Sequence, residues 1–108
     1  MSWEQLIISS HIARDRRERC ARINTVLNGD WGKIIYCTNT QHGSIYISDM
    51  GLCGIVNEEK GVLITCYLLG PKQAKYYYSL SNKHFPASLN KRIMKNDKVY
   101  FKLYCEHL

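Results

Sequence analysis

Apolar residues recur at helical spacing near the start of the chain, between residues that favour helix ends. The members of this stripe are Ile12, Cys20, Ile23 and Leu27. Intervals of three, four and eight residues place side chains on one face of an α-helix. Ser10 can cap the start of this helix, and Asn28-Gly29 can end it. The pattern therefore predicts a helix over 10–27, preceded by a short helix from Ser2 in which Gln5 completes a capping box.

After Trp31 the pattern changes to short runs of β-branched and aromatic residues that are separated by turn residues. Such runs predict β-strands, here over 33–38, 44–48, 52–56 and 62–68. The segment 39–43 joins the first two strands as a hairpin, and the other connections fit an antiparallel meander. The nearly continuous apolar run Val62-Leu63-Ile64 favours a central position for the last of these strands.

The last third of the chain begins where Gly70-Pro71 interrupts the strand pattern. The segment 72–80 is compatible with either a helix or an irregular basic and aromatic segment. Helical spacing returns over 86–95, and Asn96-Asp97 is expected to end that helix. Strict alternation of Val99, Phe101 and Leu103 with polar or aromatic residues then predicts a final strand over 98–104. The expected fold is an α+β domain spanning 1–108, with N-terminal helices packed on an antiparallel sheet of four to five strands.

Length and cysteine usage narrow the class of protein. The chain has 108 residues, and no stretch reaches the roughly 20 apolar residues of a membrane-spanning helix. Its N-terminus lacks the features of a secretory signal. The five cysteines are odd in number and widely spaced, with no CxxC pair. We therefore expect a cytoplasmic protein without membrane partner, cofactor or metal.

Charge adds a preference for polyanionic partners. The formal net charge is +6 and the pI is about 9.1, which favours nucleic acid or an anionic membrane surface. Five arginines crowd the predicted helix over 10–27, at positions 14, 16, 17, 19 and 22. This basic helix is the most unusual local feature of the sequence, and RNA is the favoured partner.

Metal-independent RNA cleavage needs a base, cationic phosphate donors and an acid. His11 can titrate near neutral pH, and Arg14 or Arg17 can hold a phosphate bidentately. Thr65 and Tyr67 share one side of a predicted strand because their spacing is two. The candidate catalytic residues are therefore His11, Arg14, Arg17, Thr65 and Tyr67. A basic helix is nevertheless more often a solvated or phosphate-contacting face, and a strand tyrosine more often packs in a core.

Binding without catalysis uses similar residues, because Arg and Lys contact phosphates and aromatic rings stack on unpaired bases. The candidate nucleic-acid-binding residues are Arg16, Arg19, Arg22, Lys72, Lys75, Tyr76, Tyr78 and His84. Tyrosine-rich basic segments also form protein interfaces. A small protein that occupies the surface of a host or partner protein is therefore a third alternative.

A family resemblance accompanies these features. It rests on His11-Ile12-Ala13-Arg14, Arg17, Arg19, Ile23, Val26-Leu27 and Gly61-Val62-Leu63-Ile64-Thr65-Cys66-Tyr67. This layout resembles the small nucleases grouped as barnase, EndoU, colicin E5/D and RelE-like (BECR), including phage-borne members. The resemblance covers about residues 10 to 68 and implies a toxin-like endoribonuclease that forms a 2′,3′-cyclic phosphate without metal. It places His11 and Arg14 or Arg17 across a cleft from Thr65 and Tyr67, whereas the predicted strand over 98–104 is additional to the family's layout.

Overall fold

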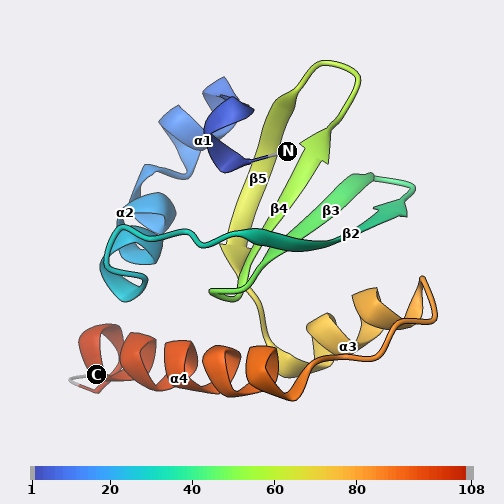
Figure 1. The fold of residues 1–108 in the computed structure, drawn as a ribbon. Helices are drawn as coiled ribbons and strands as arrows, with labels where there is room; N and C mark the ends of the chain where they lie inside the picture. The colour runs from blue at the N-terminus through green and yellow to red at the C-terminus, as the bar shows by residue number, and fades with distance from the viewer. Residues whose placement is uncertain (1, 107–108) are drawn as a thin grey trace.

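A five-stranded sheet lies between two pairs of helices (Figure 1). The computed structural model describes residues 2–106, apart from the side chains of residues 11 and 15. In chain order the elements are the 3-10 turn Trp3–Gln5, β1 (Ile7–Ile8), α1 (Ser10–Asp15), α2 (Arg17–Val26), β2 (Ile34–Thr40), β3 (Gly43–Ser48), β4 (Leu52–Asn57), β5 (Val62–Leu68), α3 (Pro71–Ser79) and α4 (Ala87–Tyr104).

The four predicted strands form the expected antiparallel meander, and a fifth strand extends it. The strand order is β1-β5-β4-β3-β2. The added strand β1 pairs in parallel with Val62 and Leu63 of β5, so the sheet is mixed and not purely antiparallel. Two residues are too few to give the alternating pattern from which a strand is predicted. β5 therefore lies between β1 and β4 at Val62 and Leu63, as its apolar run predicted, and its later residues have no strand on one side.

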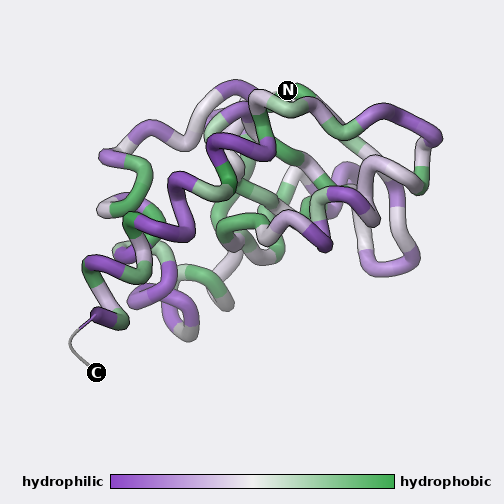
Figure 2. Tube along the Cα trace, turned by 90° about the horizontal axis from the view of Figure 1, so that it is seen from below, coloured by the Kyte–Doolittle hydropathy of each residue, from purple (hydrophilic) through white to green (hydrophobic). Residues whose placement is uncertain are grey.

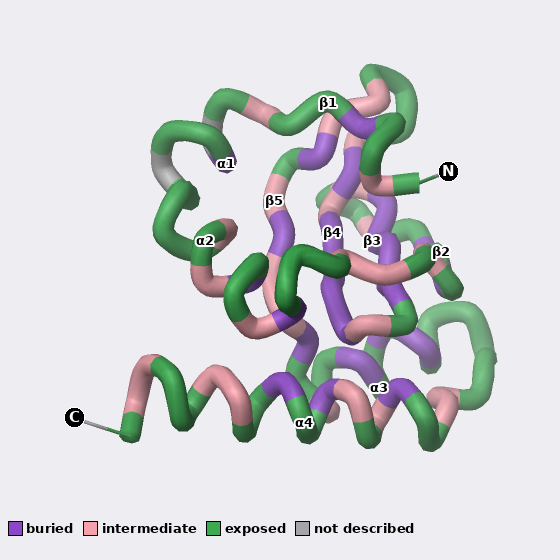
Figure 3. The backbone as a smooth tube through the Cα atoms, turned by 60° about the vertical axis from the view of Figure 1, so that its left-hand side comes forward, coloured by how far each residue is buried: buried purple, intermediate pink, exposed green. Residues whose placement is uncertain are grey.

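Each face of the sheet is covered by its own helices, and the burial of the sheet is shown in Figure 3. On one face, Ile12, Ile23 and Leu27 pack with the buried side chains of β4 and β5. On the other face, Tyr77 of α3 and Ile93 of α4 pack with residues of β2, β3 and β4. Coverage on both faces explains why all the residues from Ser44 to Ser48 are buried although their apolar and polar residues alternate.

The N-terminal helix is divided into two helices. α1 ends at Asp15, and Arg16 adopts a non-helical conformation before α2 begins. Between Ile12 and Cys20, no side chain that the structure describes is buried, so core packing does not hold this stretch in one straight helix. The N-cap is Ser9 and not Ser10, because the Ser9 hydroxyl accepts the Ile12 N–H at 3.3 Å and donates to the Ile64 carbonyl of β5 at 3.2 Å.

The C-terminal segment corrects the sequence prediction most strongly. The undecided segment 72–80 is helical in α3, and α4 continues through Asn96 to Tyr104 where a strand was expected over 98–104. Asn96 does not end the helix, because its buried side chain donates to the Met50 carbonyl in the turn between β3 and β4, at 2.7 Å. The alternation that suggested a strand has no buried face, since Phe101 and Leu103 are both exposed.

None of the helices in the described part of the chain is long and apolar enough to cross a membrane.

Candidate functional site

A groove opens where β5 has no neighbouring strand. β1 pairs only with the first two residues of β5, which leaves the later part of that strand as an open edge between α2 and α4. The hollow has a volume of about 810 Å³. Its lining residues are Arg16, Glu18, Arg19, Arg22, Ile23, Tyr67, Leu68, Leu69, Gly70, Gln73, Asn96, Asp97 and Tyr100. We call this hollow the α2–α4 groove.

A row of arginines forms one wall of the α2–α4 groove. Arg19 and Arg22 lie one turn apart on α2, and Arg16 precedes the first residue of that helix; all three line the groove. All three were predicted from the sequence as nucleic-acid-binding residues. Arg14 and Arg17 are exposed and do not line the groove. Because α2 turns one side toward β5, the arginine-rich segment is divided into residues that line the groove and residues that face solvent.

Arg22 joins the two walls of the groove. Its guanidinium lies 2.7 Å from Glu18 and donates to the Tyr100 hydroxyl of α4 at 2.9 Å. It also lies 4.7 Å from the centroid of the Tyr104 ring, within the range of a cation–π contact. These contacts fix Arg22 as a strut between α2 and α4. A ligand in the groove would then meet Arg16 at the start of α2, Arg19 on α2 and the carboxylate of Asp97 on α4.

Tyr67 of β5 lines the other side of the groove. The Tyr67 hydroxyl lies 2.8 Å from that of Tyr77, which also accepts a hydrogen bond from the Gln73 amide at 3.2 Å. Burial, the neighbouring Cys53 thiol and the hydrogen bond to Tyr77 raise the pKa of Tyr67. Tyr67 therefore stays protonated at neutral pH and can donate a hydrogen bond, but it is not suited to act as a base.

The predicted catalytic residues do not all converge on this groove. Thr65 and Tyr67 share a face of β5 as their spacing predicted, and it is the face that α3 and α4 cover. A bulge at Ile64 turns Leu63 and Cys66 toward α1 and α2 instead. Tyr67 reaches the groove at the open edge of the strand, whereas Thr65 is not among its lining residues. His11 belongs to α1, and its side chain lies outside the described residues.

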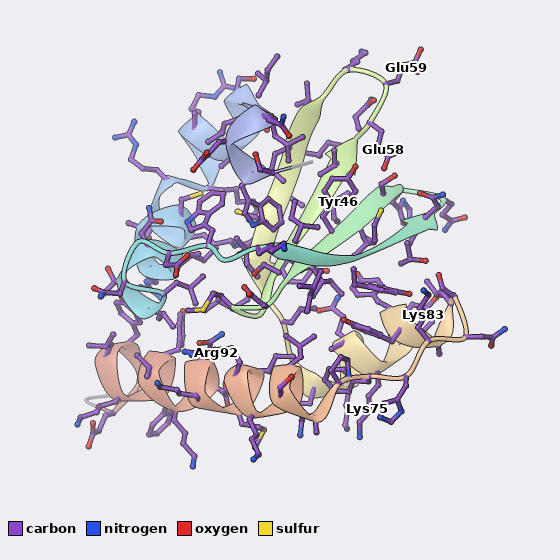
Figure 4. All side chains as sticks on the ribbon, viewed as in Figure 1. Tyr46, Glu58, Glu59, Lys75, Lys83 and Arg92 are labelled. Atoms are coloured by element: carbon purple, nitrogen blue, oxygen red, sulfur yellow. The ribbon has the colours of Figure 1, made fainter. Side chains whose placement is uncertain are left out.

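The remaining predicted binding residues lie on the α3 side of the molecule. Lys72, Lys75, Tyr76 and His84 are exposed and do not line the groove. Figure 4 shows Lys75 and Lys83 on the α3 side of the structure, away from α2. Tyr78 is buried, and its ring stacks on that of Tyr36 with centroids 4.0 Å apart. Its packing removes Tyr78 from the surface that a nucleic acid can reach.

A second hollow, of about 400 Å³, lies at the β2–β3 hairpin and differs from the groove in charge. Its described lining contains Glu58 and neither Lys nor Arg. Glu58 accepts a hydrogen bond from the Tyr46 hydroxyl at 2.7 Å (Figure 4). Burial, together with this hydrogen bond, raises the pKa of Tyr46. An acidic hollow repels phosphate, so the α2–α4 groove is the candidate site for an anion.

Within residues 2–106, apart from the side chains not described, no three His, Cys, Asp or Glu residues gather closely enough to hold a metal ion.

Comparison of the chain with protein-family models, with curated proteins and with solved structures found no match.

Proposed function

We propose that this protein binds single-stranded RNA, with a phosphodiester of the strand held in the α2–α4 groove. The observation that carries the proposal is the pair Arg16 and Arg19, which line one wall of a hollow of about 810 Å³ beside the Arg22 strut. Guanidinium groups match phosphate oxygens bidentately. The volume lies within the range of about 300–1,000 Å³ that is typical of ligand sites, and the formal charge of +6 favours association with a polyanion.

The other groups in the groove suit recognition better than proton transfer. Tyr67 and Tyr100 carry hydroxyls, and Gln73 carries an amide that can bond to ribose or base edges. Asp97 disfavours a phosphate beside it and so directs the backbone toward the arginines of α2. Cleavage of RNA and membership of the BECR superfamily stay predictions from the sequence. Binding needs no more than the groups that the groove contains.

A matched pair of double variants tests the proposal. Fluorescence anisotropy with a labelled single-stranded RNA of about 12 nucleotides gives Kd for the wild type, for Arg16→Gln/Arg19→Gln and for Arg14→Gln/Arg17→Gln. Both variants lose two arginines from the same region of the chain, but only the first pair lines the groove. We expect the groove variant to bind at least tenfold more weakly, since hydrogen bonds to charged groups contribute about 1.5–3 kcal/mol each. The control should stay within about threefold.

Three other outcomes would contradict the proposal or change its class. Equal weakening by the two variants would assign binding to diffuse charge and not to the groove. Absence of salt-sensitive binding would point to a protein partner. RNA products that form in EDTA, and that disappear in His11→Ala, would support the predicted endoribonuclease in place of a binding protein.

A further inference from the structure

The positive charge of the chain is concentrated in its C-terminal helices. From α3 to the end of α4, residues 71–104 contain eight Lys and Arg residues and one acid, Asp97. That segment has a formal charge of +7, compared with +6 for the whole chain. The rest of the molecule is therefore slightly acidic, in spite of the arginines of α2. A polyanion that approaches the protein is attracted most strongly to the layer that contains α3 and α4.

Four lysines of α4 form one row on its outer surface, at positions 91, 95, 98 and 102, and all four are exposed. At about 100° per residue they fall within an arc of about 60°. The buried residues Leu89, Ile93 and Asn96 are centred on the opposite side of the helix. Figure 3 shows the buried segments of α4 turned toward the sheet and the exposed segments turned away. Seen from below, hydrophilic residues recur along this helix (Figure 2). We call these four residues the lysine row.

Two apolar side chains flank the lysine row. Met94 is 46% exposed and Phe101 is 59% exposed, and both lie on the same flank of the row by helical spacing. Phe101 is next to Lys102 in sequence and one turn from Lys98. An exposed aromatic ring among lysines is the combination with which proteins hold single-stranded nucleic acid, where bases stack on rings and cations contact phosphates.

The same face is poorly suited to a membrane surface. A helix that lies in a membrane interface inserts its apolar side, but the apolar side of α4 is already packed in the core through Leu89 and Ile93. The outer face offers Met94 and Phe101 among four lysines, which is a small apolar area to insert. Lysines beside so small an apolar area therefore favour a nucleic acid as the occupant.

We propose that the lysine row and Phe101 form a second RNA-contacting surface, which extends the binding site beyond the α2–α4 groove. This inference rests on the proposed function, because α4 also supplies Tyr100 and Asp97 to the groove. From Lys91 to Lys102 the row covers 12 residues, and the 11 steps between its ends rise about 16 Å at 1.5 Å per residue. That length can lie beside several phosphates of a single strand. A strand that leaves the groove can thus continue across α4 onto the lysine row.

RNA length and charge position together provide the test. Kd is measured for RNAs of about 5 and about 20 nucleotides, across about 50–200 mM salt. The test variant is Lys95→Gln/Lys98→Gln, and the matched control is Lys33→Gln/Lys60→Gln, which removes the same charge from exposed positions outside the helix. Glutamine preserves helix propensity, and circular dichroism verifies that the variants are folded.

We expect the Lys95→Gln/Lys98→Gln variant to bind the long RNA at least fivefold more weakly, and its salt slope to fall by about 1.4, or 0.7 for each lost phosphate contact. Its affinity for the short RNA should remain close to that of the wild type. Phe101→Leu should weaken binding of the long RNA by about fivefold or more through loss of stacking, without a change in the salt slope.

The possible failures are distinguishable. Equal effects of the two lysine pairs on the long RNA would refute the lysine row while leaving groove binding intact. An equal loss for short and long RNA would refute the extended path. Absence of RNA binding by the wild type would reject the proposed function together with this inference, and binding to vesicles of anionic lipid in its place would assign the row to a membrane surface.

Discussion

Replacement of Asn96 with alanine tests how α4 is held against the sheet. Asn96 is 3% exposed, and its side-chain amide donates to the Met50 carbonyl at 2.7 Å. Close packing surrounds this bond: a Cβ on Gly51, which has φ +82°, would lie 2.8 Å from the Asn96 amide nitrogen. The Asn96→Ala variant would leave the Met50 carbonyl without this hydrogen-bond donor.

The expected cost follows from two opposing effects. A buried acceptor that loses its donor costs about 1–3 kcal/mol. Alanine regains up to about 0.7 kcal/mol through its higher helix propensity. The free energy of unfolding should therefore fall by about 0.5–2.5 kcal/mol, which corresponds to a decrease in Tm of about 2–10 °C for a chain of this size. Asn90→Ala, at a half-buried position in the same helix, is the control and should cost less.

Asn96→Asp sharpens the same test through its pH dependence. The new carboxylate would be buried beside a carbonyl oxygen, and burial should raise its pKa above the value near 3.9 in the unfolded chain. The charged form is then disfavoured in the folded state, so the penalty grows as pH rises from about 4 to 7 and shrinks as the group is protonated. Urea denaturation followed by circular dichroism measures both variants. A change below about 0.5 kcal/mol for Asn96→Ala and Asn96→Asp would show that residue 96 is an exposed helix end, and would refute a continuous α4.

Two further perturbations test the cores on the two faces of the sheet. A Cβ on Gly54 would lie 2.6 Å from the Trp3 ring and 2.8 Å from Leu63, so Gly54→Ala should lower the free energy of unfolding by about 1–3 kcal/mol. A double-mutant cycle with Trp3→Ala should show a coupling energy above about 0.5 kcal/mol, and additive effects would contradict the contact. Burial raises the pKa of the Cys53 and Cys66 thiols from 9.0 to about 12. Above about pH 9 the unfolded chain therefore releases protons that the folded chain retains, and the free energy of unfolding should fall as pH rises. The urea midpoint under reducing conditions should decrease less between about pH 8 and 10 in Cys53→Ala/Cys66→Ala than in the wild type, and an equal decrease would contradict the buried thiols.

The sequence predicts the meander well because its strands combine β-branched runs with clear turn signals. Gly43 and Gly51, for example, both adopt positive φ at the turns where the chain reverses. The sequence fails at α4 because the alternation of Val99, Phe101 and Leu103 also fits a helix surface that is not buried. Asn96 resembles a helix stop until its partner is known, and that partner lies 46 residues away in the chain.

The candidate site was predictable in its residue types but not in its geometry. The density of arginines singled out α2, but the sequence could not show which of them line a groove, because that depends on the short pairing of β1 with β5. The lysine row was missed for a related reason. Positions 91, 95, 98 and 102 carry a clear helical spacing, but the segment 98–104 was interpreted as a strand, on which Lys98 and Lys102 would not continue a helical row.

Side-chain NMR of the arginines provides the most direct test of RNA binding in the α2–α4 groove. In a titration with a short single-stranded RNA, the Nε signals of Arg16 and Arg19 should shift and broaden as phosphates bind, while those of Arg14 and Arg17 should change little. Assignment by single Arg→Lys variants identifies each signal. Shifts confined to Arg14 and Arg17, or no shift at RNA concentrations that saturate the anisotropy signal, would contradict binding in the groove.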